Sequence, residues 1–234
     1  MTSPRLRAVG ALSVLVLLAG CGGEDGGGDN AFAKQSGDKI ADAAKTDMKA
    51  LDAVRFSGEI NSDGDTIKLD IQSSSAGDCT GTIGIGDGTA EVAAKDGTNW
   101  FRPDEAFWRA NAGESADAII EAVGDKWVLD TDANFSQFCD LDAFFDGIFE
   151  DDGKGTYKAT GTEEIDGEDV VKVEQTDDDG SATGYVLVDG KHYLVKLERK
   201  EGDQPGALEF SEFNKDFEVD APSEDEVIDL NSVS

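Results

Sequence analysis

The segment that follows residue 53 alternates between apolar and polar residues. Every second residue of 54–60 is apolar or glycine, and the same period returns in 67–71, beyond a polar turn at 62–65. A period of two places alternate side chains on opposite faces of a strand, so these runs predict a β-hairpin with one buried face. Turns rich in Gly and Asp separate further strands, which we predict at 79–85, 89–94 and 98–101.

The first and middle parts of the domain have helical periodicity instead. Residues 38–53 place apolar side chains near the spacing of an amphipathic helix. Three more helices are predicted, at 104–110, 115–123 and 135–149. The last has a broad apolar stripe with four phenylalanines, and such a stripe suits either a solid core or the wall of a cavity.

Strands return after this helical insert. We predict them at 156–165, 170–175, 183–188, 193–199 and 207–213. A chain with strand meanders on both sides of a helical segment favours an α+β fold, in which helices cover the apolar face of one curved antiparallel sheet.

Leu18-Ala19-Gly20-Cys21 ends a short apolar run near the N-terminus. The run at 8–18 has eleven residues and follows Arg5 and Arg7, whereas a membrane-spanning helix needs roughly 20 apolar residues. A basic start and a short apolar stretch are typical of a secretory signal. The small residues before Cys21 resemble a lipobox, in which the thiol receives diacylglycerol. We therefore expect 1–20 to be a lipoprotein signal peptide and Cys21 to be lipidated.

Residues 21–37 are expected to form a flexible acidic tether. The part at 22–30 consists of glycine, acids and one asparagine, a composition typical of a flexible coil. A diacylated Cys21 would hold the protein at the outer face of the cytoplasmic membrane. Residues 38–234 are predicted to form a single domain with an ample core.

The chain is strongly acidic. It has 20 Lys and Arg against 51 Asp and Glu, a net charge of −31, and loss of Arg5 and Arg7 with the signal peptide makes this −33. Such a surface repels phosphates, which excludes nucleic acid as a partner and disfavours anionic lipid headgroups. Solubility or adaptation to salt explains the acidity without an acid-specific function.

Cys79 and Cys139 remain after lipidation of Cys21. Because an exported chain folds in a non-reducing setting, we predict a disulfide between them. Closing a loop of about 60 residues would stabilise the fold by roughly 4 kcal/mol. Two distant cysteines and a single histidine do not make a zinc site.

Catalytic and metal-binding motifs are weak. His192, the only histidine, follows Gly190 and Lys191 in a predicted hairpin turn, where we expect it to be solvated. With 51 acids, no carboxylate pair can be singled out for catalysis. An EF-hand-like spacing crosses two predicted strands, so we expect neither a metal nor a cofactor. Its residues are Glu59, Asn61, Asp63, Gly64 and Asp70.

Several short segments accompany the lipobox in a characteristic order. They are Arg55-Phe56-Ser57-Gly58-Glu59-Ile60, Trp100-Phe101-Arg102, Phe107-Trp108, Tyr185-Val186-Leu187-Val188-Asp189-Gly190, Phe213-Asn214, Ala221-Pro222 and Val227-Ile228-Asp229-Leu230. Together they resemble the LolA/LolB-type lipoproteins of the LppX and LprG group. The resemblance implies an unclosed antiparallel half-barrel, helices covering its concave face, and a cavity for the acyl chains of lipids, glycolipids or lipoproteins. It does not imply catalysis.

We therefore expect a membrane-anchored, monomeric lipoprotein that is not an enzyme and carries acyl chains in an apolar cavity. A membrane transporter is a further candidate partner. The alternative, if the buried face is filled, is a non-catalytic envelope lipoprotein that binds a protein partner or acts as a sensor. The predicted lipid-binding residues lie on the inward faces of the first three strands and on the helix at 135–149, the expected lid. They are Phe56, Ile67, Leu69, Ile71, Ile83, Ile85, Phe138, Leu141, Phe145 and Ile148.

Overall fold

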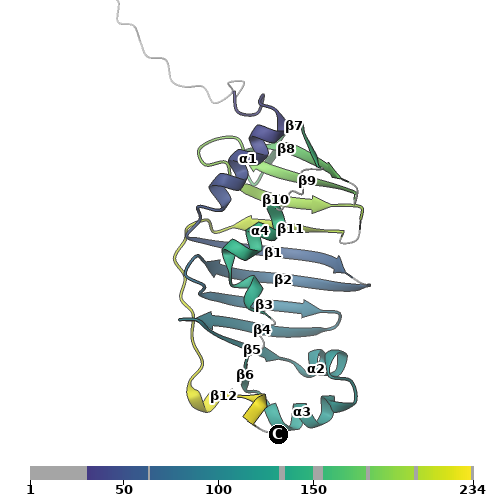
Figure 1. The fold of residues 1–234 in the computed structure, drawn as a ribbon, viewed down its shortest axis with the longest axis vertical. Coiled ribbons are helices and arrows are strands. Elements are labelled where there is room, and N and C mark those ends of the chain that lie inside the picture. Colours follow the sequence, from purple (N-terminus) through teal and green to yellow (C-terminus); the bar gives the residue numbers. More distant parts are fainter. Residues whose placement is uncertain are drawn as a thin grey trace, which may run out of the picture.

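A single mixed sheet forms the body of the molecule (Figure 1). The computed structural model describes residues 31–62, 64–131, 135–149, 155–177, 180–202 and 205–232. Twelve strands follow the order β12-β6-β5-β4-β3-β2-β1-β11-β10-β9-β8-β7. The sheet is a curved, unclosed half-barrel with helices on its concave face, which confirms the predicted α+β class. Cys21 and the predicted signal peptide lie outside the described residues.

The first meander follows the predicted alternation. Its strands are β1 (Ala53–Ser62), β2 (Asp65–Ser74), β3 (Cys79–Ile85), β4 (Gly88–Lys95) and β5 (Thr98–Pro103). Phe56 pairs with Ile71, and Leu69 pairs with Ile83. These registers place the apolar side chains on one face, where all four are buried. On the outer face, Arg55 forms two 2.7 Å hydrogen bonds with Asp70.

The second meander completes the sheet. It contains β7 (Thr156–Ile165), β8 (Glu168–Asp177), β9 (Gly180–Leu187), β10 (Leu194–Arg199) and β11 (Gly206–Ser211). β11 pairs with β1 through the register Phe56 to Phe210, and this pairing makes the two meanders one continuous surface.

Two short strands were not predicted. They are β6 (Trp127–Leu129) and β12 (Val227–Ile228), which pair in parallel. The chain after β11 runs past the strand ends to reach β6 (Figure 1), and it buries Val219 on the way. Runs of three and two residues are too short to carry a recognisable period.

The helices differ from the predictions mainly at their ends. They are α1 (Gly37–Met48), α2 (Glu105–Asn111), α3 (Ala116–Val123) and α4 (Leu141–Phe149). The expectation of one helix over 135–149 is wrong, because 136–138 form a 3₁₀ turn and the Asp140 carboxylate then accepts a hydrogen bond from the Ala143 N–H at 3.0 Å. This contact caps a new helix start. No helix among the described residues is long and apolar enough to cross a membrane.

Helix α4 packs on the centre of the concave face. Phe145 is 1% exposed and contacts Phe210, while Phe144 stacks on Phe56 with ring centroids 4.2 Å apart. Just before the helix, Cys139 is bonded to Cys79 of β3, as predicted, and its carbonyl accepts a 3.0 Å hydrogen bond from the buried Ser73 hydroxyl. The N-terminal end of α4 is therefore fixed to the first meander.

Loss of this disulfide is expected to lower the free energy of unfolding by about 2–4 kcal/mol, because the bond closes a 60-residue separation in the unfolded chain. Urea unfolding of the oxidised protein and of the Cys79→Ala/Cys139→Ala variant measures the difference. Rapid alkylation of both thiols in the native, untreated protein would contradict the pairing.

Helix α1 covers the other end of the concave face. Its residues Ile40, Ala44 and Met48 are buried. At its start a Cβ on Gly37 would lie 2.4 Å from the Tyr157 carbonyl carbon, so only glycine lets α1 approach β7 this closely. Residues 31–36, which we assigned to the tether, lead into this helix, and Phe32 among them is buried. The limits of the tether remain a prediction.

Candidate functional site

A cavity of about 280 Å³ lies where α1 and the end of α4 cross the second meander. Strands β7 to β10 supply its floor. The lining residues are Asp38, Ala41, Asp42, Ala44, Lys45, Ile148, Phe149, Tyr157, Val173, Gln175, Ala182, Gly184, Val186, Leu194 and Leu197.

Small residues leave this space open. Ala41 and Ala44 face the sheet from α1, and Ala182 and Gly184 face them from β9. Five aliphatic side chains lie around them, and Val186 and Leu194 among these are buried. A hollow whose floor is mainly apolar suits a ligand with an apolar part.

Apart from Tyr157 of β7, the polar residues of the cavity lie on one stripe of α1 and on β8. Asp38 and Asp42 are exposed, whereas Lys45 and Gln175 are half-buried. The Lys45 ammonium donates a 3.2 Å hydrogen bond to the carbonyl of Phe149, at the C-terminal end of α4. At the C-cap of α1, four residues after Lys45, Lys49 forms an ion pair with Asp146 of α4. These contacts join the two helices that cover the cavity.

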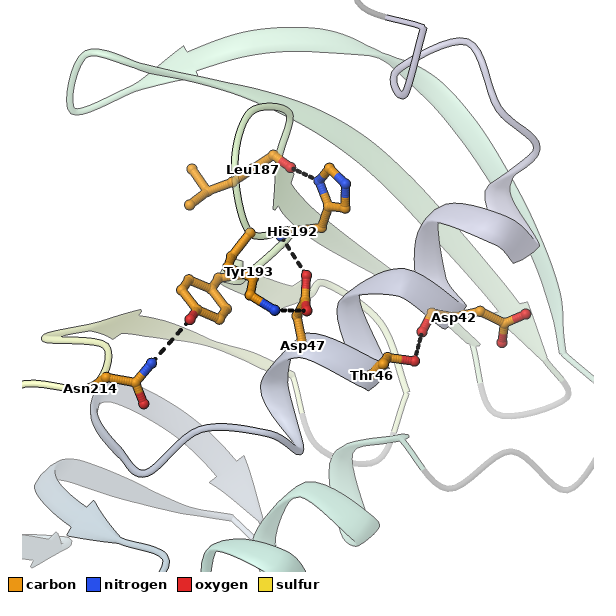
Figure 2. A network of polar contacts seen from close by, with 8 residues as sticks. Asp42, Thr46, Asp47, Leu187, His192, Tyr193 and Asn214 are labelled. Atoms are coloured by element: carbon orange, nitrogen blue, oxygen red, sulfur yellow. Dashed lines mark hydrogen bonds and ion pairs between the residues drawn. The ribbon is translucent and has the colours of Figure 1, made fainter.

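A polar network holds the opposite side of α1 against the loop between β9 and β10 (Figure 2). The Asp47 carboxylate accepts hydrogen bonds from the backbone N–H of His192 at 2.8 Å and from the Lys191 ammonium at 3.0 Å. The His192 ring lies 3.1 Å from the Leu187 carbonyl through Nδ1 and stacks on Phe32 with centroids 3.5 Å apart. The expectation that His192 is solvated in a turn is therefore wrong, because Phe32 and this loop half-bury the ring.

The network lowers the pKa of Asp47. Partial burial acts to raise the pKa, but the hydrogen bond from His192 and the ion pair with Lys191 outweigh it. A carboxyl group whose pKa is lower in the folded state stabilises the fold above its unfolded pKa, and this contribution is lost as the pH falls through the folded value.

Asp47→Asn is therefore expected to lower the free energy of unfolding by roughly 1.5–3 kcal/mol at pH 7, the range of a hydrogen bond to a charged group. The difference from the unsubstituted protein should shrink as the pH falls below the ordinary value of 3.8. Urea unfolding at several pH values measures both effects, with the exposed Asp52→Asn as the control. A loss that is independent of pH would contradict an electrostatic role for Asp47.

The predicted lipid-binding residues lie mostly outside this cavity. Of the ten, Ile148 is in its lining. Six are buried side chains of the core on the first meander and α4, and three are half-buried against that core. The six are Phe56, Leu69, Ile71, Ile83, Leu141 and Phe145, and the three are Ile67, Ile85 and Phe138. Their contact with lipid stays a prediction.

The lining residues that sequence reasoning missed belong to α1, to the last residue of α4 and to the second meander. Val173, Ala182, Gly184 and Val186 alternate on inward positions of β8 and β9. The usable signal was the pairing of small residues on these strands with Ala41 and Ala44 of the helix, since small side chains on facing elements leave unfilled volume.

The EF-hand-like spacing does not form a loop. Glu59 and Asn61 lie in β1 and Asp70 lies in β2, where its carboxylate binds Arg55. Among the residues that the structure describes, no group of three or more acidic, histidine or cysteine side chains could hold a metal ion.

An unclosed antiparallel half-barrel with helices on its concave face is the fold of the LppX type. The crystal structure of the lipoprotein LppX from Mycobacterium tuberculosis matches with a TM-score of 0.50 at 16% identity, covering 82% of this chain and 100% of LppX. That of LprF from Mycobacterium bovis matches with a TM-score of 0.56 at 13% identity, covering 79% of this chain and 96% of LprF. At such identities the likeness shows the fold. No protein-family model and no curated protein sequence matches the chain.

Proposed function

We propose that this protein is a membrane-anchored extracytoplasmic lipoprotein that binds the acyl chain of a lipid, glycolipid or lipoprotein. The observation that carries the proposal is the apolar cavity between α1, α4 and β7 to β10. The aliphatic side chains in its walls would remove an acyl chain from contact with water, which is favourable. The fold shared with the lipoprotein LppX supports this assignment.

The cavity volume suits one chain. An engineered apolar cavity of about 150 Å³ holds one benzene molecule. By the same packing, 280 Å³ takes roughly ten aliphatic carbons. A second chain would need more space or movement of α4.

Cys21, lipidated, is the proposed anchor, and the acidic tether lets the domain stand off from the outer face of the cytoplasmic membrane. We propose no catalytic role. The single histidine packs on Phe32 and binds backbone oxygen, so it is held in a structural network away from the cavity lining.

The test is calorimetric titration with monodecanoylglycerol, whose ten-carbon chain matches the volume. The chain beginning at Gly22 is suitable, because every described element and the core lie within 31–232. We expect one site with a Kd of about 1–100 μM, since burial of the chain is partly offset by the cost of association. We also expect a negative heat-capacity change. Absence of binding would favour the alternative of a surface that binds a protein partner.

A further inference from the structure

We propose that the cavity selects single-chain lipids whose headgroup carries no negative charge. The inference rests on the proposed function and adds the class of headgroup. The headgroup would lie at the polar rim, which we define as Asp38, Asp42, Lys45 and Gln175.

The orientation of a bound lipid follows from where the polar groups are. Asp38, Asp42 and Lys45 are separated by four and three residues, so they share one stripe of α1. Gln175 faces the cavity from β8, while the remaining lining from the sheet is aliphatic apart from Tyr157. An acyl chain therefore gains most by entering among Val186, Leu194 and their neighbours, which leaves its polar end at the rim.

The rim disfavours an anion. Lys45 is its one ammonium group, and that group already donates to the Phe149 carbonyl. The two exposed carboxylates of Asp38 and Asp42 are left to face the headgroup, and Figure 2 shows Asp42 projecting from a different side of α1 than Asp47. Each carboxylate should weaken binding of a negatively charged headgroup about threefold at low salt.

Two other positive features do not reverse this balance. Lys39 lies about 100° around the helix from Asp38, off the stripe that lines the cavity. The positive end of the α1 dipole already has Asp38 in its first turn. A neutral headgroup with hydroxyls is suited to the rim, because hydroxyls donate to the carboxylates and exchange hydrogen bonds with the Gln175 amide.

The experiment compares monodecanoylglycerol with decanoate, which have the same chain, by calorimetric titration at pH 8 and low salt. We expect decanoate to bind about tenfold more weakly, and the ratio of the two Kd values to narrow as salt is added. Asp38→Asn/Asp42→Asn should reduce the ratio to about twofold or less. The control Glu114→Gln/Glu121→Gln changes the net charge equally at exposed sites near α3, and it should leave the ratio unchanged.

The outcomes separate the two proposals. Equal or tighter binding of decanoate overturns the headgroup selectivity and leaves the acyl-chain function standing. If the control variant changes the ratio of the two Kd values as much as the rim variant does, the effect comes from overall charge. That result would overturn the role of the rim. Failure of both ligands to bind overturns the proposed function and this inference with it.

Discussion

Gly184→Leu is expected to weaken binding of monodecanoylglycerol by at least about tenfold without destabilising the protein. The new side chain enters the cavity and takes the place of about four chain carbons, each worth roughly 0.8 kcal/mol of burial. A Cβ at this position lies 3.1 Å from the Leu194 Cδ1, the mobile end of a side chain that can shift. The φ angle of Gly184 is outside the left-handed region, so a leucine backbone fits.

Thr183→Leu is the matched control for this variant. Thr183 neighbours Gly184 on β9 but points to the opposite face, where it pairs with Glu174 and Glu198. The control places the same leucine side chain on the same strand, facing away from the cavity, and should bind lipid as the unsubstituted protein does. Calorimetric titration and thermal melting measure both variants. Undiminished binding by Gly184→Leu would mean that the lipid lies elsewhere.

Phe145→Ala is expected to lower the free energy of unfolding by about 3–5 kcal/mol. Phe145 is 1% exposed and packs between Phe149 and Phe210, so its removal leaves a void that the surrounding rings cannot fill. Urea unfolding measures this loss. If the dependence of the free energy of unfolding on urea concentration has the same slope in both proteins, the shift in midpoint reports a change in stability.

Ile148→Ala provides the comparison on the same helix. Ile148 is half-buried and borders the cavity, so we expect a cost of only about 1–2 kcal/mol together with weaker lipid binding. A loss below about 1 kcal/mol for Phe145→Ala would contradict the packing of α4 as part of the core. Such a result would instead support the predicted role of Phe145 in a movable lid.

Most strands of the sheet could be predicted from the sequence because one face of the sheet is buried and the other is exposed to solvent. On β1 and β2 the inward Phe56 and Ile71 are fully buried, while Arg55 and Asp70 pair in solvent on the outer face. The pairing of β6 with β12 was not predictable in the same way. The two strands are only two and three residues long and lie about 100 residues apart in the sequence. Only the path of the C-terminal chain brings them together.

The position of the cavity could not be read from alternation. Both meanders have apolar inward positions, but Phe144 stacks on Phe56 and fills the first, whereas Ala182 and Gly184 leave the second open. Whether a buried face is filled depends on which helix lies over which strands. That arrangement is set by tertiary contacts such as the approach of Gly37 to Tyr157, which carry no periodic signal.

Native mass spectrometry with solvent extraction is the most direct test of acyl-chain binding. The chain from Gly22 onward would be exported in a lipid-rich bacterial host and purified without detergent. We expect one bound lipid of defined mass in the unsubstituted protein and in Thr183→Leu, and its loss in Gly184→Leu. A protein that is empty on purification and takes up no added monodecanoylglycerol would contradict the assignment of the cavity as a lipid site.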